Sequence, residues 1–221
     1  IHHHYSTDKF MPGFDADYFT ALVKGSEGVT FPLAQGQSVD DFLAFLRPIL
    51  FDPAIDAKKV SQDSTKDLVV NSAVNFYEGV TQAEVEAYYK GVVDEKDATP
   101  VSYGLNTRVV KKGGKVVEEV ASIDGLYGPA IAKIVYWLEK AAGVAENARQ
   151  KKVIEALVAY YRTGDLEKFD EYNILWVEDT ASLVDFVNGF IEVYEDPLGM
   201  KASWESVVNF KDLAATKRAE A

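Results

Sequence analysis

The chain has 221 residues, of which 48% are hydrophobic and 12% aromatic, enough for a sizeable core in one large domain or two small ones. Its 35 acidic and 23 basic residues give a net charge of −12, which repels phosphate backbones and argues against a nucleic-acid partner. No apolar run approaches the roughly 20 residues of a membrane span, and the absence of cysteine excludes disulfides and thiolate zinc sites. We therefore expect a cytoplasmic chain with no nucleic-acid or membrane partner.

The first 98 residues are expected to be rich in short helices. Residues 15–24 and 38–47 show amphipathic helical patterns, with prolines and glycines between them. Residues 81–84, Thr-Gln-Ala-Glu, form a capping box, in which the threonine hydroxyl and the glutamate carboxylate satisfy backbone donors at the start of a helix. This box predicts a helix that carries Val85, Tyr88, Tyr89 and Val92.

A β-hairpin is predicted over residues 100–121. Residues 101–111 and 115–121 are rich in β-branched side chains, which favour extended backbone. Gly113-Gly114 stands between the two runs and is a two-residue hairpin signal, since both positions of such a turn favour glycine.

Two helices are predicted over residues 129–163. The first follows Gly128-Pro129, because proline suits the first turn of a helix, and its apolar residues fall at helical spacing. The second runs from about Glu146 to Arg162, and Gly164 is expected to end it.

The end of the chain, residues 172–210, is expected to be rich in strands. Three short runs with strand-like composition are separated by Asp-Thr, Asp-Pro and glycine breaks. The runs are residues 173–177, 189–194 and 206–210. Together with the helices they indicate an α+β chain. No internal repeat, low-complexity tract or linker stands out, so we predict a single structural unit, 1–221.

The histidines do not by themselves predict a metal site. The only three, His2, His3 and His4, are adjacent in sequence and cannot alone provide the convergent ligands of a zinc centre. They are open to two interpretations, a residual purification tag or native sequence, and in either case we assign no metal. Without another histidine or a cysteine, a Ser-His-Asp triad or Cys-His pair is disfavoured.

An acidic and aromatic set near the end of the chain is the remaining candidate for chemistry. Glu192 and Tyr194 are two residues apart, so on a strand they would point to one face. A solvated strand face explains a lone Glu-x-Tyr as well and is the favoured interpretation from the residues alone. Paired carboxylates could also indicate glycoside hydrolysis, but in so acidic a chain that pattern has almost no specificity.

Three stretches near the end of the chain carry more distinctive motifs. They are residues 160–165 (Tyr-Tyr-Arg-Thr-Gly-Asp), 176–179 (Trp-Val-Glu-Asp) and 189–199 (Gly-Phe-Ile-Glu-Val-Tyr-Glu-Asp-Pro-Leu-Gly). In this order they resemble the dipeptidyl peptidase III family, in which a Gly-Phe-Ile-Glu-x-Tyr strand runs into Asp-Pro-x-Gly. An aromatic-Glu pair follows in the family and corresponds here to Trp204-Glu205.

The resemblance implies a fragment of a larger enzyme. Members of the family are zinc exopeptidases that remove dipeptides from peptide N-termini, and they have two lobes with a cleft between them. Their zinc motif, His-Glu-x-x-Gly-His, is absent from this sequence. The chain would then be the substrate-binding lower lobe, with short helices packed around a small mixed or barrel-like β core.

The same resemblance sets the expected partners and one alternative. Zinc would belong to the parent enzyme and not to this chain, and the partners would be a peptide substrate and the missing catalytic lobe. The alternative is a non-catalytic peptide-binding or scaffold module. The native reading frame decides between the two, because a peptidase must continue into the zinc motif.

Three residues receive roles from the resemblance. Glu192 would bind the free N-terminal ammonium of the peptide, Glu205 would help at that end, and Tyr194 would be catalytic, donating its hydroxyl to the oxygen of the tetrahedral intermediate. Cα atoms two residues apart on a strand are about 6.6 Å apart, and two residues of extended peptide span roughly the same length. As a hypothesis, one strand carrying both groups would measure off a dipeptide.

Overall fold

A computed structural model describes residues 11–55 and 57–219, and the chain divides into two compact units, Ile1–Asn75 and Phe76–Ala221. We predicted a single unit from the absence of a linker. The boundary at Asn75 indeed carries no run of proline, glycine or serine that could have marked it.

Among the residues described in the first unit, two short helices form where helical patterns were predicted. Helix α2 (Ala16–Gly25) begins at Asp15, whose carboxylate accepts a hydrogen bond from a backbone N–H of the first turn. Helix α3 (Val39–Phe51) begins at a capping box formed by Ser38 and Asp41, and it extends past the predicted end at residue 47.

The second unit opens with a three-stranded mixed sheet. Strand β1 (Tyr77–Glu78) runs parallel to β2 (Thr107–Lys112), and β3 (Lys115–Val120) pairs antiparallel with β2. The predicted hairpin is confirmed, although its first strand begins at Thr107 because the preceding residues fold into turns. Helix α4 (Gln82–Val92) connects β1 to β2 and starts at the predicted capping box.

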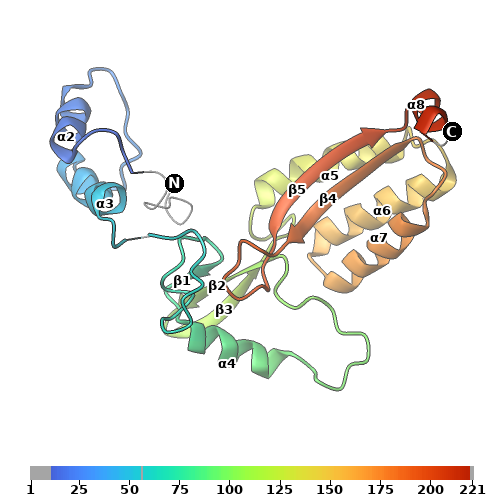
Figure 1. The fold of residues 1–221 in the computed structure, drawn as a ribbon, viewed down its shortest axis with the longest axis horizontal. Helices are drawn as coiled ribbons and strands as arrows, with labels where there is room; N and C mark the ends of the chain where they lie inside the picture. The colour runs from blue at the N-terminus through green and yellow to red at the C-terminus, as the bar shows by residue number, and fades with distance from the viewer. Residues whose placement is uncertain (1–10, 56, 220–221) are drawn as a thin grey trace. The chain divides into compact units, whose positions relative to one another are not determined.

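Three helices follow, and they pack against one another in chain order (Figure 1). They are α5 (Gly128–Ala142), α6 (Ala148–Thr163) and α7 (Leu166–Glu178). The helices predicted over 129–163 are confirmed, and Gly164 ends α6 in the left-handed conformation, with φ of 72°. The strand predicted at 173–177 is wrong. Those residues continue α7, whose first turn Asp165 caps.

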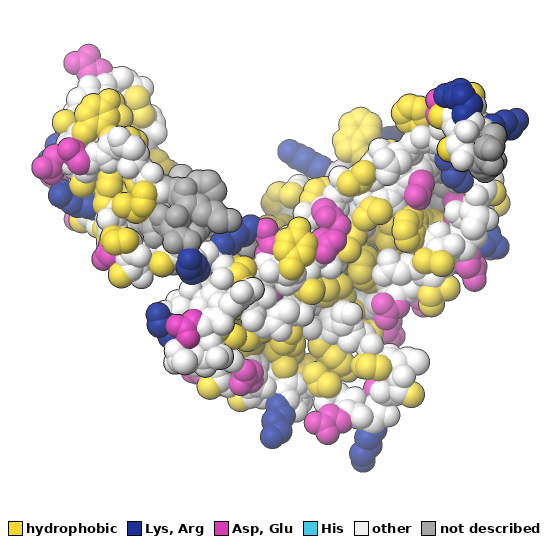
Figure 2. All heavy atoms as spheres, viewed as in Figure 1, with side chains coloured by type: hydrophobic (Ala, Val, Ile, Leu, Met, Phe, Trp, Pro, Cys, Tyr) yellow, Lys and Arg dark blue, Asp and Glu magenta, His cyan; other side chains and the backbone are white. Residues whose placement is uncertain are grey.

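A long antiparallel hairpin, β4 (Val184–Glu192) and β5 (Ser203–Phe210), runs alongside these helices, and α8 (Leu213–Ala219) follows it (Figure 1). The α+β class is therefore confirmed, with helices around small sheets. The described strands form two separate sheets, of three and two strands, and not a closed barrel. Hydrophobic side chains reach the surface of this unit (Figure 2), and the most exposed include Val144, Val208 and Phe210.

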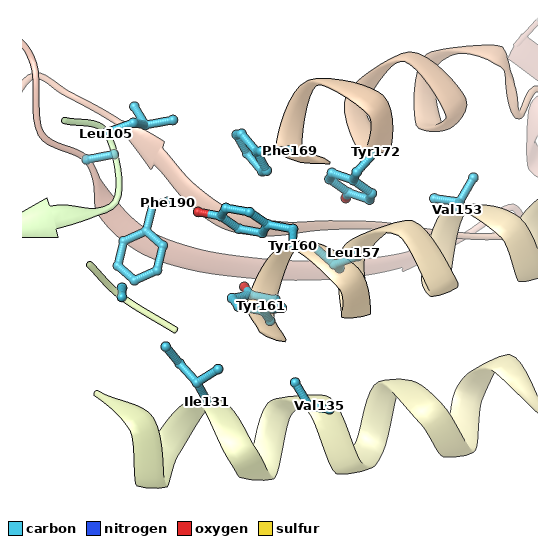
Figure 3. Close-up of a cluster of buried hydrophobic side chains, with 12 residues drawn as sticks. Leu105, Ile131, Val135, Val153, Leu157, Tyr160, Tyr161, Phe169, Tyr172 and Phe190 are labelled. Carbon is cyan, nitrogen blue, oxygen red and sulfur yellow. The ribbon is translucent and has the colours of Figure 1, made fainter. Parts of the chain in front are cut away.

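The core of the second unit lies between the helices and the hairpin (Figure 3). Tyr160 and Leu157 of α6 are fully buried, and the ring of Tyr160 lies 4.6 Å from that of Phe169 in α7, centroid to centroid. From the hairpin, Phe190 joins this cluster at 7% exposure. This contact fixes β4 on the helices just before Glu192.

Candidate functional site

Two of the three predicted site residues lie on one face of the β4–β5 hairpin. Glu205 is directly opposite Gly189, and Glu192 is directly opposite Ser203, with a register shift between Phe190 and Glu192. Because directly opposite residues share a face, as do residues two apart on a strand, Glu192 lies on the side of Ser203 and Glu205. The extra residue of the bulge turns Glu192 to that side.

Glycine at position 189 allows the close approach of α7 to this face. A Cβ added there would stand 3.0 Å from a ring carbon of Phe169, closer than carbon atoms normally approach. Trp204, which precedes Glu205 in β5, donates its indole N–H to the hydroxyl of Tyr161 in α6 at 2.7 Å. Adjacent strand residues face opposite sides, so this bond helps to hold Glu205 on the side away from Tyr161.

Neither carboxylate is neutralised by a neighbour. Glu192 and Glu205 are both half-buried, and among the residues described neither side chain forms a hydrogen bond or an ion pair. A carboxylate that is partly withdrawn from water and has no partner favours a cation as ligand.

Tyr194 occupies a different position from the one its spacing predicted. Strand β4 ends at Glu192, and Tyr194 lies in the turn that follows, with 72% of its surface exposed. The prediction that Glu192 and Tyr194 share a strand face is therefore wrong, because the bulge and the turn end the alternation on which it depended. The hypothesis that one strand carries both groups and measures off a dipeptide is therefore not supported.

A buried carboxylate, which the sequence did not single out, holds the turn after Tyr194. Asp196 is 4% exposed and accepts the hydroxyl of Tyr77 at 2.8 and 2.9 Å. It also accepts the backbone N–H groups of Leu198, Met200 and Lys201, at 3.2, 2.8 and 2.8 Å. The Asp-Pro-x-Gly motif thus has a structural role here, since its aspartate fixes the turn and ties it to β1.

A buried lysine ties the far end of the same turn. Lys201 is fully buried, and its ammonium donates to the hydroxyls of Tyr89 and Thr107, at 2.7 and 2.8 Å, and to the carbonyl of Gly104 at 3.3 Å. A carboxylate oxygen of Glu118 lies 3.9 Å away. Burial lowers the pKa of Lys201 from 10.5 to about 8, against the raising influence of Glu118 and Asp196.

The described residues hold no set of metal ligands. No group of three or more His, Cys, Asp or Glu side chains is arranged to bind a metal within residues 11–55 and 57–219. His2, His3 and His4 lie outside the described residues. In the same ranges, every helix is too short or too polar to cross a membrane.

Comparison with known proteins identifies one family. Residues 101–221 match the sequence model of peptidase family M49. Dipeptidyl peptidase 3 of Rattus norvegicus is 33% identical over 93 residues, and that of Homo sapiens is 30% identical over 96 residues. These matches cover 41% and 43% of this chain and 13% of each relative.

Two solved structures show similar folds. Dipeptidyl-peptidase III from Corallococcus sp. strain EGB superimposes with a TM-score of 0.52 at 28% identity, over 65% of this chain and 26% of that one. DPP III from Caldithrix abyssi superimposes with a TM-score of 0.55 at 20% identity, over 93% of this chain and 36% of that one. The chain therefore spans about a third or less of the proteins it resembles.

Proposed function

Because this chain belongs to peptidase family M49, we propose that it is the substrate-binding part of a dipeptidyl peptidase III, which removes dipeptides from peptide N-termini. The observation that carries the proposal is the pair of half-buried, unpaired carboxylates of Glu192 and Glu205 on one face of the hairpin. In this proposal the protein works on peptides in the cytoplasm.

The carboxylates would recognise the free N-terminus of the peptide. A protonated α-amino group can donate charge-assisted hydrogen bonds to Glu192, and Glu205 adds a second negative charge beside it. An acetylated N-terminus carries no charge and would leave a desolvated carboxylate without its partner, which costs about 1 to 3 kcal/mol. The site would thus select peptides with an unblocked N-terminus.

Tyr194 would act on the peptide bond that is cleaved. Its exposed hydroxyl is free to donate a hydrogen bond to the oxygen on which negative charge develops during hydrolysis. Metallopeptidases need a metal ion to polarise that bond and activate water. The described residues do not fit such an ion, so we assign the zinc site to the rest of the parent protein.

The alternative is a non-catalytic module that binds peptide N-termini. The lack of a metal-ligand set among the described residues favours it, and the same two carboxylates would serve. The intact mass of the native gene product separates the two functions. A product much larger than 24.4 kDa that releases dipeptides from an arginyl-arginyl chromogenic substrate with added zinc supports the peptidase, whereas an inactive product of that mass supports the module.

Two substitutions in the native gene product test the residue assignments. Glu192→Gln should weaken binding of an unblocked peptide by about tenfold or more, without changing binding of its N-acetylated form. Tyr194→Phe should lower kcat by about a hundredfold and leave peptide affinity nearly unchanged. Glu171→Gln, which alters an exposed carboxylate of α7, is the matched control. Wild-type kinetics in both site variants would remove the assignment.

A further inference from the structure

The segment that follows β4 and carries Tyr194 contains two buried charged residues, both of them C-terminal to Tyr194. We call residues 193–202 the Tyr194 turn. Asp196 lies near its start and is bound to Tyr77 of β1, while Lys201 lies near its end and is bound to Tyr89 of α4 and Thr107 of β2. The backbone of Ala202 also donates to the carbonyl of Leu105 at 2.8 Å.

The exposed ring of Tyr194 depends on this turn for its location. With 72% of its surface exposed and no hydrogen bond among the described residues, the side chain is not held by packing of its own. Its position relative to Glu192 is therefore set by the backbone of the turn. Glu192 itself is placed by β4, which Phe190 fixes on the core.

Stability alone is a poor explanation for two buried charges at this place. Burying an ionised group costs free energy that its partners only partly return, and apolar side chains of similar size often stabilise a fold as well or better. Hydrogen bonds are directional, however, so a carboxylate with four donors fixes both the shape of a turn and its orientation on the sheet.

We propose that Asp196 and Lys201 are positioning residues, which orient the Tyr194 turn so that the Tyr194 hydroxyl stands at a fixed place relative to Glu192. The inference rests on the proposed function of Tyr194 and Glu192. Tyr77 acts with Asp196, and Tyr89 and Thr107 act with Lys201. None of these five residues needs to touch the substrate.

Removing the hydroxyl of Tyr77 tests the first fastening with the least disturbance. In the native gene product, Tyr77→Phe should lower kcat about tenfold, because displacing a reacting group by a fraction of an ångström has effects of this order. KM for an unblocked peptide should stay within about twofold, because Glu192 and Glu205 keep their places on the hairpin. Lys201→Met tests the second fastening and should show the same division between kcat and KM.

Combining each variant with Tyr194→Phe separates positioning from a general structural effect. If Tyr77 acts through the Tyr194 hydroxyl, Tyr77→Phe should lower kcat in the wild-type background and have little further effect once that hydroxyl is gone. Val153→Ala is the control, because it creates a cavity in α6 far along the core without touching the turn. It should lower the melting temperature and leave kcat unchanged.

Each outcome decides one of the two claims. Non-additive losses of kcat in both double variants support positioning. The positioning inference is overturned, while the proposed function stands, if kcat falls equally with and without the Tyr194 hydroxyl. It is also overturned if neither Tyr77→Phe nor Lys201→Met lowers kcat. If Tyr194→Phe itself has wild-type kcat, the proposed function of Tyr194 fails and the positioning inference fails with it.

Discussion

The end of β4 around Phe190 and the turn that follows β4 are held in place by different kinds of contact. Around Phe190 the hairpin rests on apolar and aromatic side chains of α6 and α7, of which Leu157 and Tyr160 are fully buried. The Tyr194 turn is held instead by hydrogen bonds to two buried charged groups, Asp196 and Lys201.

The difference separates stability from orientation. Apolar burial contributes much free energy but has little directional preference. Buried hydrogen bonds contribute less free energy on balance, yet each one fixes a distance and an angle. Substitutions in the two regions should therefore differ in what they change, with folding free energy most sensitive in the first region and activity most sensitive in the second.

The largest loss of stability is expected in the apolar region. Leu157→Ala removes a fully buried side chain from α6 and should lower the free energy of unfolding by about 2 to 5 kcal/mol, since it leaves a cavity. Urea denaturation followed by circular dichroism measures this loss. Val144→Ala, at a side chain that is 83% exposed, should change the same quantity by less than about 0.5 kcal/mol.

A smaller loss is expected where the backbone approaches the polar cluster. Gly104 has φ of +83°, and a Cβ there would stand 2.6 Å from the Tyr89 hydroxyl and 3.2 Å from the Lys201 ammonium. Gly104→Ala should lower the free energy of unfolding, measured by urea denaturation, by about 2 kcal/mol, because it strains the backbone and displaces the neighbouring side chains.

Gly113→Ala is the matched control for that change. Gly113 also has a positive φ, of +56°, but open space surrounds its missing side chain. Gly113→Ala should lower the free energy of unfolding by only about 1 kcal/mol, because it strains the backbone without displacing a side chain. Equal losses in the two variants would show that the polar cluster tolerates displacement, contrary to the directional role assigned to it.

The pH dependence of stability should report the burial of Lys201. Its pKa is about 8 in the folded chain, below the 10.5 of an unburied lysine, so between these values the unfolded chain binds more protons. The contribution of Lys201 to stability should therefore rise as the pH increases above 8 and be constant below it. Between pH 7.5 and 9.5 the wild type should gain about 1 to 2 kcal/mol over Lys201→Met, measured by urea denaturation at each pH. If the difference in unfolding free energy between the wild type and Lys201→Met did not change with pH, the pKa of Lys201 would not be lowered in the folded chain.

The smallest effect on stability is expected at the proposed ammonium site. Glu192 is half-buried without a partner among the described residues, so Glu192→Gln should change the free energy of unfolding by no more than about 0.5 kcal/mol. Thermal melts of this variant and of Glu171→Gln should nearly coincide. A large stabilisation would instead show that the charge of Glu192 destabilises the folded protein when no peptide is bound.

Local signals in the sequence predicted much of the fold. The capping box at residues 81–84, the glycine pair of the hairpin and Gly164 at the end of α6 each act within one turn of chain, so neighbouring residues suffice to predict them. The strand predicted at residues 173–177 failed because a short run of apolar and β-branched residues suits either a strand or a helix. These residues are helical because they continue α7, which begins at its cap, Asp165.

The residues of the candidate site were chosen from the resemblance, and the sequence did not predict their arrangement in space. Resemblance to a family singled out Glu192, Tyr194 and Glu205, but the spacing of Glu192 and Tyr194 suggested an uninterrupted strand, and a bulge inserted after Phe190 is not visible in the residue pattern. Lys201 carried no signal at all. Its partners Tyr89 and Thr107 are 112 and 94 residues away in sequence, and only the folded chain brings them together.

These long separations have a consequence for the order of folding. The Tyr77–Asp196 bond joins residues 119 apart, and contacts of such range close large loops whose entropy must be overcome first. Helices α5 to α7 connect neighbours in sequence and can form early, whereas the Tyr194 turn must wait for both the β1–β2–β3 sheet and the hairpin. We expect the Tyr194 turn to be among the last segments to fold, so that partly folded molecules would be unable to bind a peptide.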